Sequence, residues 1–78
     1  MHGSTIAYAL PREMPVRLGI LDVQGRTIAT LAQGVQGAGR HEARWDTDVR
    51  GSRAPAGLYF VVLESEGART LRRLVLTR

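Results

Sequence analysis

Few side chains in this chain have the chemistry that catalysis or metal binding requires. The sequence contains no Cys and no Lys, so it lacks disulfides, thiolate zinc ligands, Cys nucleophiles and lysine Schiff bases. The two imidazoles, His2 and His41, are too far apart to match the ligand spacing of a zinc site. None of the three serines lies in a G-x-S-x-G context: Ser4, Ser52 and Ser65. We therefore predict a structural role for His41, no catalytic residue, no metal site and no cofactor.

The acidic residues leave one alternative open. Asp46 and Asp48 lie two positions apart in a segment rich in Gly, Ser and Pro, and oxygen ligands on such a loop suit calcium. The D-x-D-x-D-G spacing is missing, so the favoured role is hydrogen bonding to turn amides. Asp22, just before Gln24-Gly25, is expected to accept turn amides in the same way. An acid–base pair of Asp22 and Glu42 would need a cleft, which we do not expect in this chain.

All eleven basic residues are Arg, and the formal net charge is +4. A basic domain is a candidate for nucleic-acid binding, but such domains cluster their charge on one face and expose aromatic side chains. Here the arginines are scattered among seven acidic residues, and Trp45, Tyr59 and Phe60 lie in apolar segments. No nucleic-acid partner is expected, and a nucleic-acid-binding β-barrel is the weakest alternative. Arginines on outer faces would keep sheets soluble and protect their edges.

The length of the chain sets a further bound. A domain of 78 residues removes only about 60% of its unfolded surface from water, so its core is thin and a deep pocket is not expected. This argues against an enzyme. No apolar run approaches the roughly 20 residues that span a bilayer, so no membrane insertion is expected. We expect residues 1–3 to be a fragment boundary and residues 4–78 to form a single domain.

The hydrophobic pattern has a period of two, which is typical of strands. We expect six segments to be strands, and in most of them larger apolar or β-branched residues alternate with polar or smaller ones: 5–10, 16–23, 26–31, 40–45, 57–63 and 68–77. Residues 57–63 are apolar on both faces, as in a central strand. A single helical turn over Ala29–Gln33 is the only helical alternative.

The segments between the predicted strands are typical of turns and loops. Gln24-Gly25 and Glu66-Gly67 are candidates for two-residue hairpin turns, in which Gly supplies a positive φ. Glycines interrupt residues 34–39, and residues 46–56 form the longest irregular stretch. Strands at this spacing predict an all-β, Ig-like antiparallel β-sandwich of about six to seven strands.

Structural roles are assigned to six residues. Trp45, the only Trp, is expected to be the core anchor, and Tyr59 is expected to be buried beside it. Gly25 and Gly57 are assigned to a turn and to the entry of the central strand. Asp22 and Asp46 are assigned to turn hydrogen bonds.

The order of several short motifs resembles the Ig-like domain of flagellar hook-capping proteins and the related carboxyl-terminal sorting domain of the bacterial type IX secretion system. The motifs run along nearly the whole chain: T-I-A-Y-A-L-P over residues 5–11, V-R-L-G-I-L-D-V-Q-G-R over 16–26, T-I-A-T-L over 27–31, A-G-R-H over 38–41, W-D over 45–46, P-A-G-L-Y-F over 55–60 and R-R-L-V-L-T-R over 72–78. The Asn-Pro motif that usually precedes the first strand of the sorting family is absent here. The resemblance therefore implies the fold and leaves open whether this chain is a complete export signal.

The resemblance also implies a function. It predicts a non-catalytic module at the carboxyl end of an exported bacterial protein, in the periplasm in transit to the cell surface or outside the cell. In the sorting family the secretion machinery reads the terminal strand, which implies a partner-binding role for residues of that strand: Arg72, Arg73, Leu74, Leu76 and Arg78. The partners would be the upstream part of the parent polypeptide and the type IX machinery. The alternative is a structural spacer or assembly domain of a hook-capping-like or other extracellular protein.

Overall fold

The computed structural model describes residues 3–46, 48–49 and 52–77, and its regular elements are all strands. Eight strands follow one another along the chain: β1 (Gly3–Leu10), β2 (Met14–Leu21), β3 (Thr27–Gln36), β4 (Gly39–Asp46), β5 (Asp48–Val49), β6 (Ser52–Arg53), β7 (Gly57–Ser65) and β8 (Ala68–Leu76). Among the described residues there is no helix of the length and apolarity that crossing a bilayer requires.

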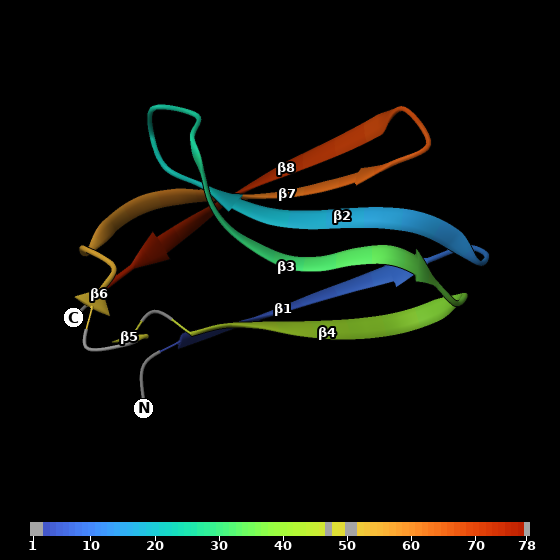
Figure 1. Ribbon diagram of the computed structural model, residues 1–78, viewed down its shortest axis with the longest axis horizontal. Coiled ribbons are helices and arrows are strands. Elements are labelled where there is room, and N and C mark those ends of the chain that lie inside the picture. Colours follow the sequence, from blue (N-terminus) through green and yellow to red (C-terminus); the bar gives the residue numbers. More distant parts are fainter. Residues whose placement is uncertain (1–2, 47, 50–51, 78) are drawn as a thin grey trace.

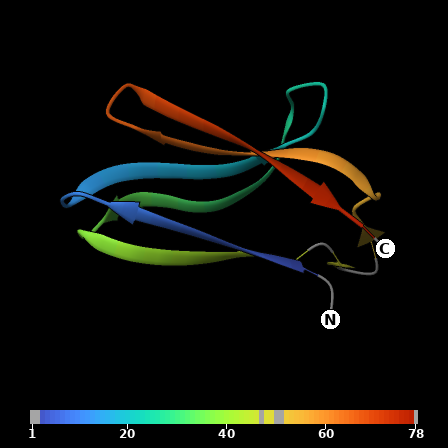
Figure 2. The same cartoon turned by 180° about the vertical axis from the view of Figure 1, so that it is seen from behind.

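The strands form two facing antiparallel sheets (Figures 1 and 2). The larger sheet has the strand order β3-β2-β7-β8, and the smaller sheet pairs β1 with β4. β5 and β6 form a separate two-stranded ladder at one end. The architecture confirms the predicted all-β, Ig-like sandwich, with β7 as a central strand between β2 and β8.

The core lies between the two sheets because alternate residues of each strand point inward. Leu18 and Ile20 on β2 are 1% and 0% exposed, the lowest values among the buried hydrophobic residues of the described chain. The central cluster joins Ile20 to three further buried residues, Trp45, Tyr59 and Leu76. Trp45 comes from the smaller sheet and the other members from the larger one, so this cluster holds the two sheets together.

The two predicted hairpin turns differ in outcome. Ser65 pairs with Ala68, so Glu66 and Gly67 form a two-residue turn, and their φ values of 51° and 85° suit type I′ geometry. The first turn is longer than the predicted Gln24-Gly25 pair. The ladder ends at Leu21 and Thr27, and the amide of Asp22 donates to the carbonyl of Arg26 at 2.9 Å.

The amide of Gly25 then donates to the carbonyl of Asp22 at 3.0 Å, and Gly25 has a φ of 83°. A turn followed by a glycine in the left-handed region is the usual form of a three-residue hairpin loop. Because three residues, Val23 to Gly25, complete this loop, the prediction of a two-residue turn was wrong in length.

β3 is the largest departure from the predicted elements. The strand continues through Gly34 to Gln36, where a glycine-rich loop was expected, and the helical turn over Ala29–Gln33 does not form. Pairing with β2 supplies a hydrogen-bond ladder, which overrides the weak local preference of this segment. Register shifts opposite Leu18/Gly19 and Ile20/Leu21 mark two irregularities where β3 accommodates extra residues.

Candidate partner-binding surfaces

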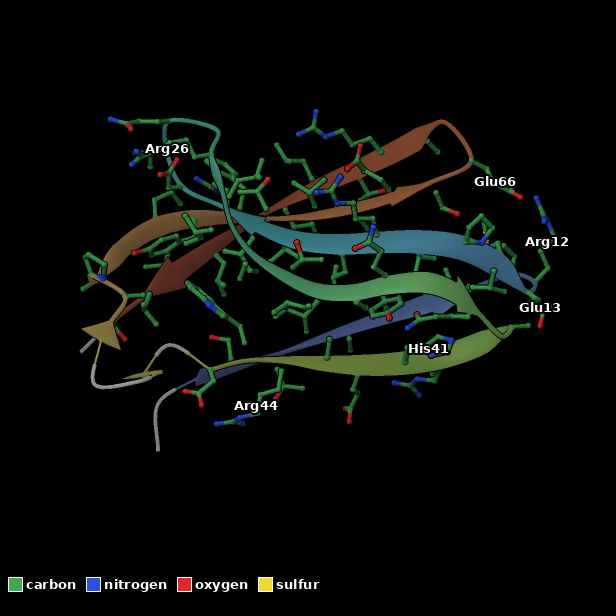
Figure 3. All side chains as sticks on the ribbon, viewed as in Figure 1. Arg12, Glu13, Arg26, His41, Arg44 and Glu66 are labelled. Atoms are coloured by element: carbon green, nitrogen blue, oxygen red, sulfur yellow. The ribbon has the colours of Figure 1, made fainter. Side chains whose placement is uncertain are left out.

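The single described imidazole has structural contacts. His41 on β4 stacks on Tyr8 of β1, with ring centroids 5.3 Å apart and planes at 20°. Its Nε2 lies 2.7 Å from the carbonyl oxygen of Gly37, to which it donates. The Tyr8 hydroxyl donates to Oε1 of Gln36 on β3. These contacts close one end of the sandwich, and Figure 3 shows His41 on β4 at that end.

Groups that would hold a metal ion do not gather in the described part of the chain. No three His, Asp or Glu side chains there are close enough to share an ion. His2 and the side chain of Asp48 lie outside the described residues, so the calcium alternative is not tested at Asp48. Asp46 ends β4, opposite Gly3 of β1.

Asp22 organises the first hairpin loop. Its Oδ1 accepts hydrogen bonds from the amides of Gln24, at 2.9 Å, and Arg26, at 3.0 Å. Its Oδ2 accepts a hydrogen bond from Nε of Arg26 at 2.9 Å. The backbone hydrogen bond from Arg26 is the main cause that lowers the pKa of the Asp22 carboxyl, because these donors favour the charged form. Asp22 thus holds the turn together through both carboxylate oxygens.

The aromatic residues lie in the core and hold the loop before β7. Trp45 is 5% exposed and Tyr59 is 6% exposed, and the two rings meet edge to face. The Tyr59 hydroxyl donates to the carbonyl of Pro55 at 2.6 Å, four residues upstream. A Tyr near the start of a strand that bonds back to the preceding backbone is a known device of Ig-like sandwiches. Gly57 begins β7 opposite Leu76, with a φ of 149°.

The residues of the terminal strand do not form one surface. Leu76 is 9% exposed and Leu74 is half-buried against the core cluster, so both point inward. Arg73 lies opposite Phe60, on the outer face of the larger sheet, and Arg72 lies opposite Val61, on the inner side. Arg78 lies outside the described residues. A partner that binds the folded domain would reach Arg72 and Arg73 from opposite sides, and binding by this strand stays a prediction.

One leucine of β8 faces outward, unlike Leu74 and Leu76. Leu71 lies an odd number of positions from Leu74, and an odd spacing puts a residue on the other face of a strand. Leu71 pairs with Val62 on the outer face and is 52% exposed.

The outer face of β7 and β8 is unusually apolar. Leu58 lies opposite Val75, and Val62 lies opposite Leu71, so these side chains share one face of the sheet. Leu58 is 38% exposed and Val75 is 67% exposed. We call the exposed members of this surface, Leu58, Leu71 and Val75, the outer stripe. The sequence analysis did not predict this surface, because it depends on the pairing of Leu58 with Val75 across two strands.

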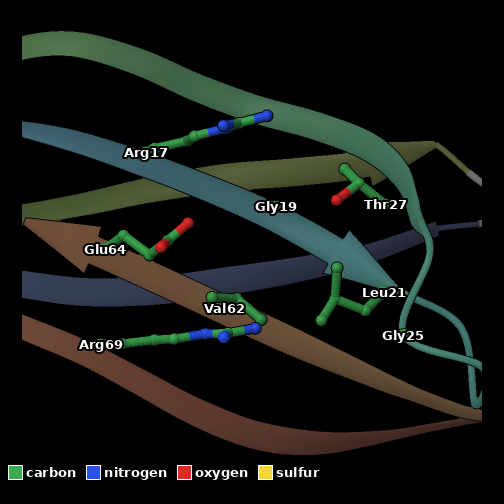
Figure 4. A pocket seen from close by; sticks show the side chains of 8 residues that line it. All are labelled: Arg17, Gly19, Leu21, Gly25, Thr27, Val62, Glu64 and Arg69. Atoms are coloured by element: carbon green, nitrogen blue, oxygen red, sulfur yellow. The ribbon is translucent and has the colours of Figure 1, made fainter.

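A shallow hollow of about 240 Å³ lies on the outer face of the larger sheet (Figure 4). It is lined by Val62, the cross-strand partner of Leu71 in the outer stripe. Gly19 is one of the residues that line it, and a Cβ at this position would meet the carbonyl oxygen of Ala29 at 3.3 Å. The register of three adjacent strands places Glu64 between Arg17 and Arg69 at its rim. The charges at this rim thus alternate in sign across three strands, with one carboxylate and two guanidinium groups.

A second hollow opens between the two sheets and has a volume of about 380 Å³. One wall is β1, from Ile6 to Ala9, and the far side includes Val61, Thr70 and Arg72. We call this hollow the edge cleft. The sequence analysis expected no cleft that would serve an acid–base pair of Asp22 and Glu42, and neither residue lines this hollow.

Comparison with known protein families assigns this chain to a family. The family model described as the FlgD Ig-like domain matches residues 2–69. No curated protein and no solved structure matched the chain. The matched range includes every strand of both sheets except most of β8.

Proposed function

The chain belongs to the FlgD Ig-like domain family, and from this premise we propose that it is a non-catalytic assembly or spacer module of an exported bacterial protein. The family is a structural type of domain, related to assembly of the flagellar hook. In this proposal the module holds neighbouring parts of the protein together or at a fixed separation. It acts in the periplasm in transit to the cell surface, or outside the cell.

The outer stripe is the observation that carries the proposal. Single exposed apolar residues are common on protein surfaces, whereas contiguous ones mark interaction sites. Leu58 and Val75 form a directly opposed pair, and Leu71 lies on the same face of β8. Arg73, which lies opposite Phe60 on that face, adds a charge of the kind enriched at interfaces. A neighbouring domain that packs on this face would remove the stripe from water.

The experiment introduces charge into the stripe of the complete natural protein. Leu71→Glu and Val75→Glu change exposed positions, so the isolated domain should keep its stability within about 0.5 kcal/mol. Val23→Glu is the matched control, because it introduces the same group at an exposed apolar position, 66% exposed, in the first hairpin loop. The proposal predicts faster proteolysis at the junction with the neighbouring domain and a larger radius of gyration for the two stripe variants only. Unchanged behaviour of both stripe variants would refute it.

The charge of the terminal strand supports a second candidate, type IX sorting. Arg69, Arg72 and Arg73 are exposed on β8, and in the described part of the chain none of them forms an ion pair. A secretion receptor would have these free guanidinium groups available. The test fuses residues 1–78 to a secreted reporter in a bacterium with type IX secretion. Sorting predicts the reporter at the cell surface, and a reporter that remains in the periplasm excludes this candidate while leaving the assembly role intact.

A further inference from the structure

β1 is an edge strand without the usual protection. Among the described residues its only neighbour is β4, so the other side of its backbone has no ladder. Natural edge strands carry charges, prolines or bulges that discourage pairing with another strand. The residues of β1, GSTIAYAL, include no charge and no proline, and the register with β4 is continuous from Gly3 to Leu10.

The other edge strands of the two facing sheets do carry such protection. β8 has three arginines in nine residues, and β4 has charged side chains at alternate positions from Arg40 to Asp46. β3 has two register shifts and a glycine, Gly34, with a φ of 120°. β1 is therefore the edge that is both regular and uncharged.

The unpaired edge of β1 borders the edge cleft. Four consecutive residues of β1, Ile6 to Ala9, line the cleft. Consecutive residues of a strand point to opposite faces, so a surface that touches all four runs along the edge of the strand. Backbone N–H and C=O groups therefore face the cleft together with the side chains.

The far side of the cleft is the inner face of the larger sheet where the smaller sheet does not cover it. Val61 and Leu63 on β7 are only partly buried there, although β7 is a central strand. The smaller sheet has two strands and the larger sheet has four, so part of the larger sheet is not covered. One further strand beside β1 would cover the side chains of Val61 and Leu63. The cleft thus has an apolar floor beside an open hydrogen-bonding edge, which is how domains accept an added strand from a partner.

Charge indicates which strand fits. Arg72 is the only charged residue that lines the cleft, it is exposed, and within the described residues it forms no ion pair. A second copy of this chain would bring another Arg72 and a further net charge of +4. An acidic side chain on the incoming strand would instead pair with Arg72.

We propose that the edge cleft binds an extended strand of another polypeptide segment, with apolar side chains at alternate positions and a carboxylate that faces Arg72. The strand pairs with the free edge of β1 and places its apolar side chains over Val61 and Leu63. This interaction goes beyond the proposed assembly role, which uses the outer stripe on the opposite face of the larger sheet.

The test uses a capped peptide, Thr-Val-Thr-Glu-Thr-Val-Thr, and the same peptide with Lys in place of Glu. Both are titrated to millimolar concentration into the 78-residue chain, and backbone amides are followed by NMR. The proposal predicts saturable chemical-shift changes at residues 6–9, 61, 63 and 72, and slower hydrogen exchange of the amides in β1. It also predicts that the Glu peptide binds about fivefold tighter than the Lys peptide, because an exposed ion pair with Arg72 is replaced by a repulsion.

Arg72→Glu should reverse this preference, and Arg73→Glu is the matched control because the same change falls on the outer face. The proposal would be overturned if the preference for the Glu peptide were reversed in both variants or in neither. Chemical-shift changes confined to β3 or β8 would also overturn it. Concentration-dependent shifts of β1 without peptide would assign the edge to a second copy and would also overturn it. Loss of peptide binding would leave the stripe experiment unaffected, so the two proposals fail separately.

Discussion

Trp45 on β4 and Tyr59 on β7 meet edge to face across the interior, with ring centroids 5.1 Å apart and ring planes at 70°. This arrangement is favourable for aromatic pairs because the positive edge of one ring meets the negative face of the other. It joins the smaller sheet to the larger one at the centre of the core cluster.

Removal of the indole should be the most damaging single substitution. Trp45→Ala leaves a cavity between the sheets, and large-to-small changes of this kind cost about 3–5 kcal/mol. A domain of this size has little stability to lose, so the variant should be largely unfolded in water. Urea denaturation measures the loss, and Val23→Ala, at a position 66% exposed, is the control that should change stability by less than about 0.5 kcal/mol. If Trp45→Phe were as unstable as Trp45→Ala, packing of an aromatic ring would not be the cause.

The hydroxyl of Tyr59 should stabilise the loop before β7. Tyr59→Phe keeps the ring on Trp45 and removes only the hydrogen bond to the Pro55 carbonyl. A net loss of about 1 kcal/mol is expected for one such bond. Thermal unfolding measures it, and unchanged tryptophan fluorescence would show that the core is retained. Equal stability of the two proteins would mean that the hydrogen bond makes no net contribution.

The carboxyl of Asp22 should make stability depend on pH in the acid range. Its pKa is lowered in the folded chain, chiefly by the hydrogen bond from the Arg26 amide, so the folded state favours the charged form. The stabilisation is complete above the unfolded pKa, about 3.9, and is lost as pH falls from there through the lower folded pKa. Asp22→Ala should unfold at a lower temperature than the unaltered chain at neutral pH, and the gap should narrow below about pH 4. A difference in unfolding temperature that stays constant with pH would contradict this role of Asp22.

The second hairpin turn contains an avoidable strain. Glu66 has a φ of 51° and is the only non-glycine residue with a positive φ in the described part of the chain. Asn tolerates this conformation better and is preferred before Gly in a type I′ turn. Glu66→Asn should therefore raise the free energy of unfolding by about 0.5 kcal/mol. The measurement is a comparison of midpoints of urea unfolding.

That substitution also removes the ion pair between Glu66 and Arg12, which face one another in Figure 3. Both side chains are exposed, at 39% and 62%, so the pair should contribute little. Arg12→Ala is the control and should leave the midpoint almost unchanged. If Glu66→Asn and Arg12→Ala destabilised the domain to the same extent, the ion pair would contribute more to stability than the relief of strain at residue 66.

The sequence pattern was informative where local rules act. Alternation of Val16, Leu18 and Ile20 located β2, and Glu66-Gly67 located the second turn, because both signals depend on neighbouring residues. β3 was predicted too short because its glycines resemble a loop, whereas pairing with β2 carries the strand through Gly34. That outcome depends on a partner that local preference does not contain.

The surfaces were harder to predict than the core. The outer stripe requires knowledge that Leu58 and Val75 are cross-strand partners, and the terminal Arg and Leu residues were taken as one set although successive residues face opposite ways. The edge cleft depends on the division of six strands into sheets of two and four, which no periodicity in one strand reveals. The absence of charge in β1 was the available signal, and it has meaning only once β1 is known to be an edge.

Side-chain footprinting is the most direct test of the assembly role. Hydroxyl radicals would be applied to the isolated domain and to the complete natural protein in its assembled state, and oxidation would be measured at Leu58, Leu71 and Val75. Val23, in the first hairpin loop and 66% exposed, serves as the internal control. The account predicts that the three stripe residues are oxidised in the isolated domain and protected in the complete protein, while Val23 is oxidised in both. Equal oxidation of the stripe in the two samples would contradict it.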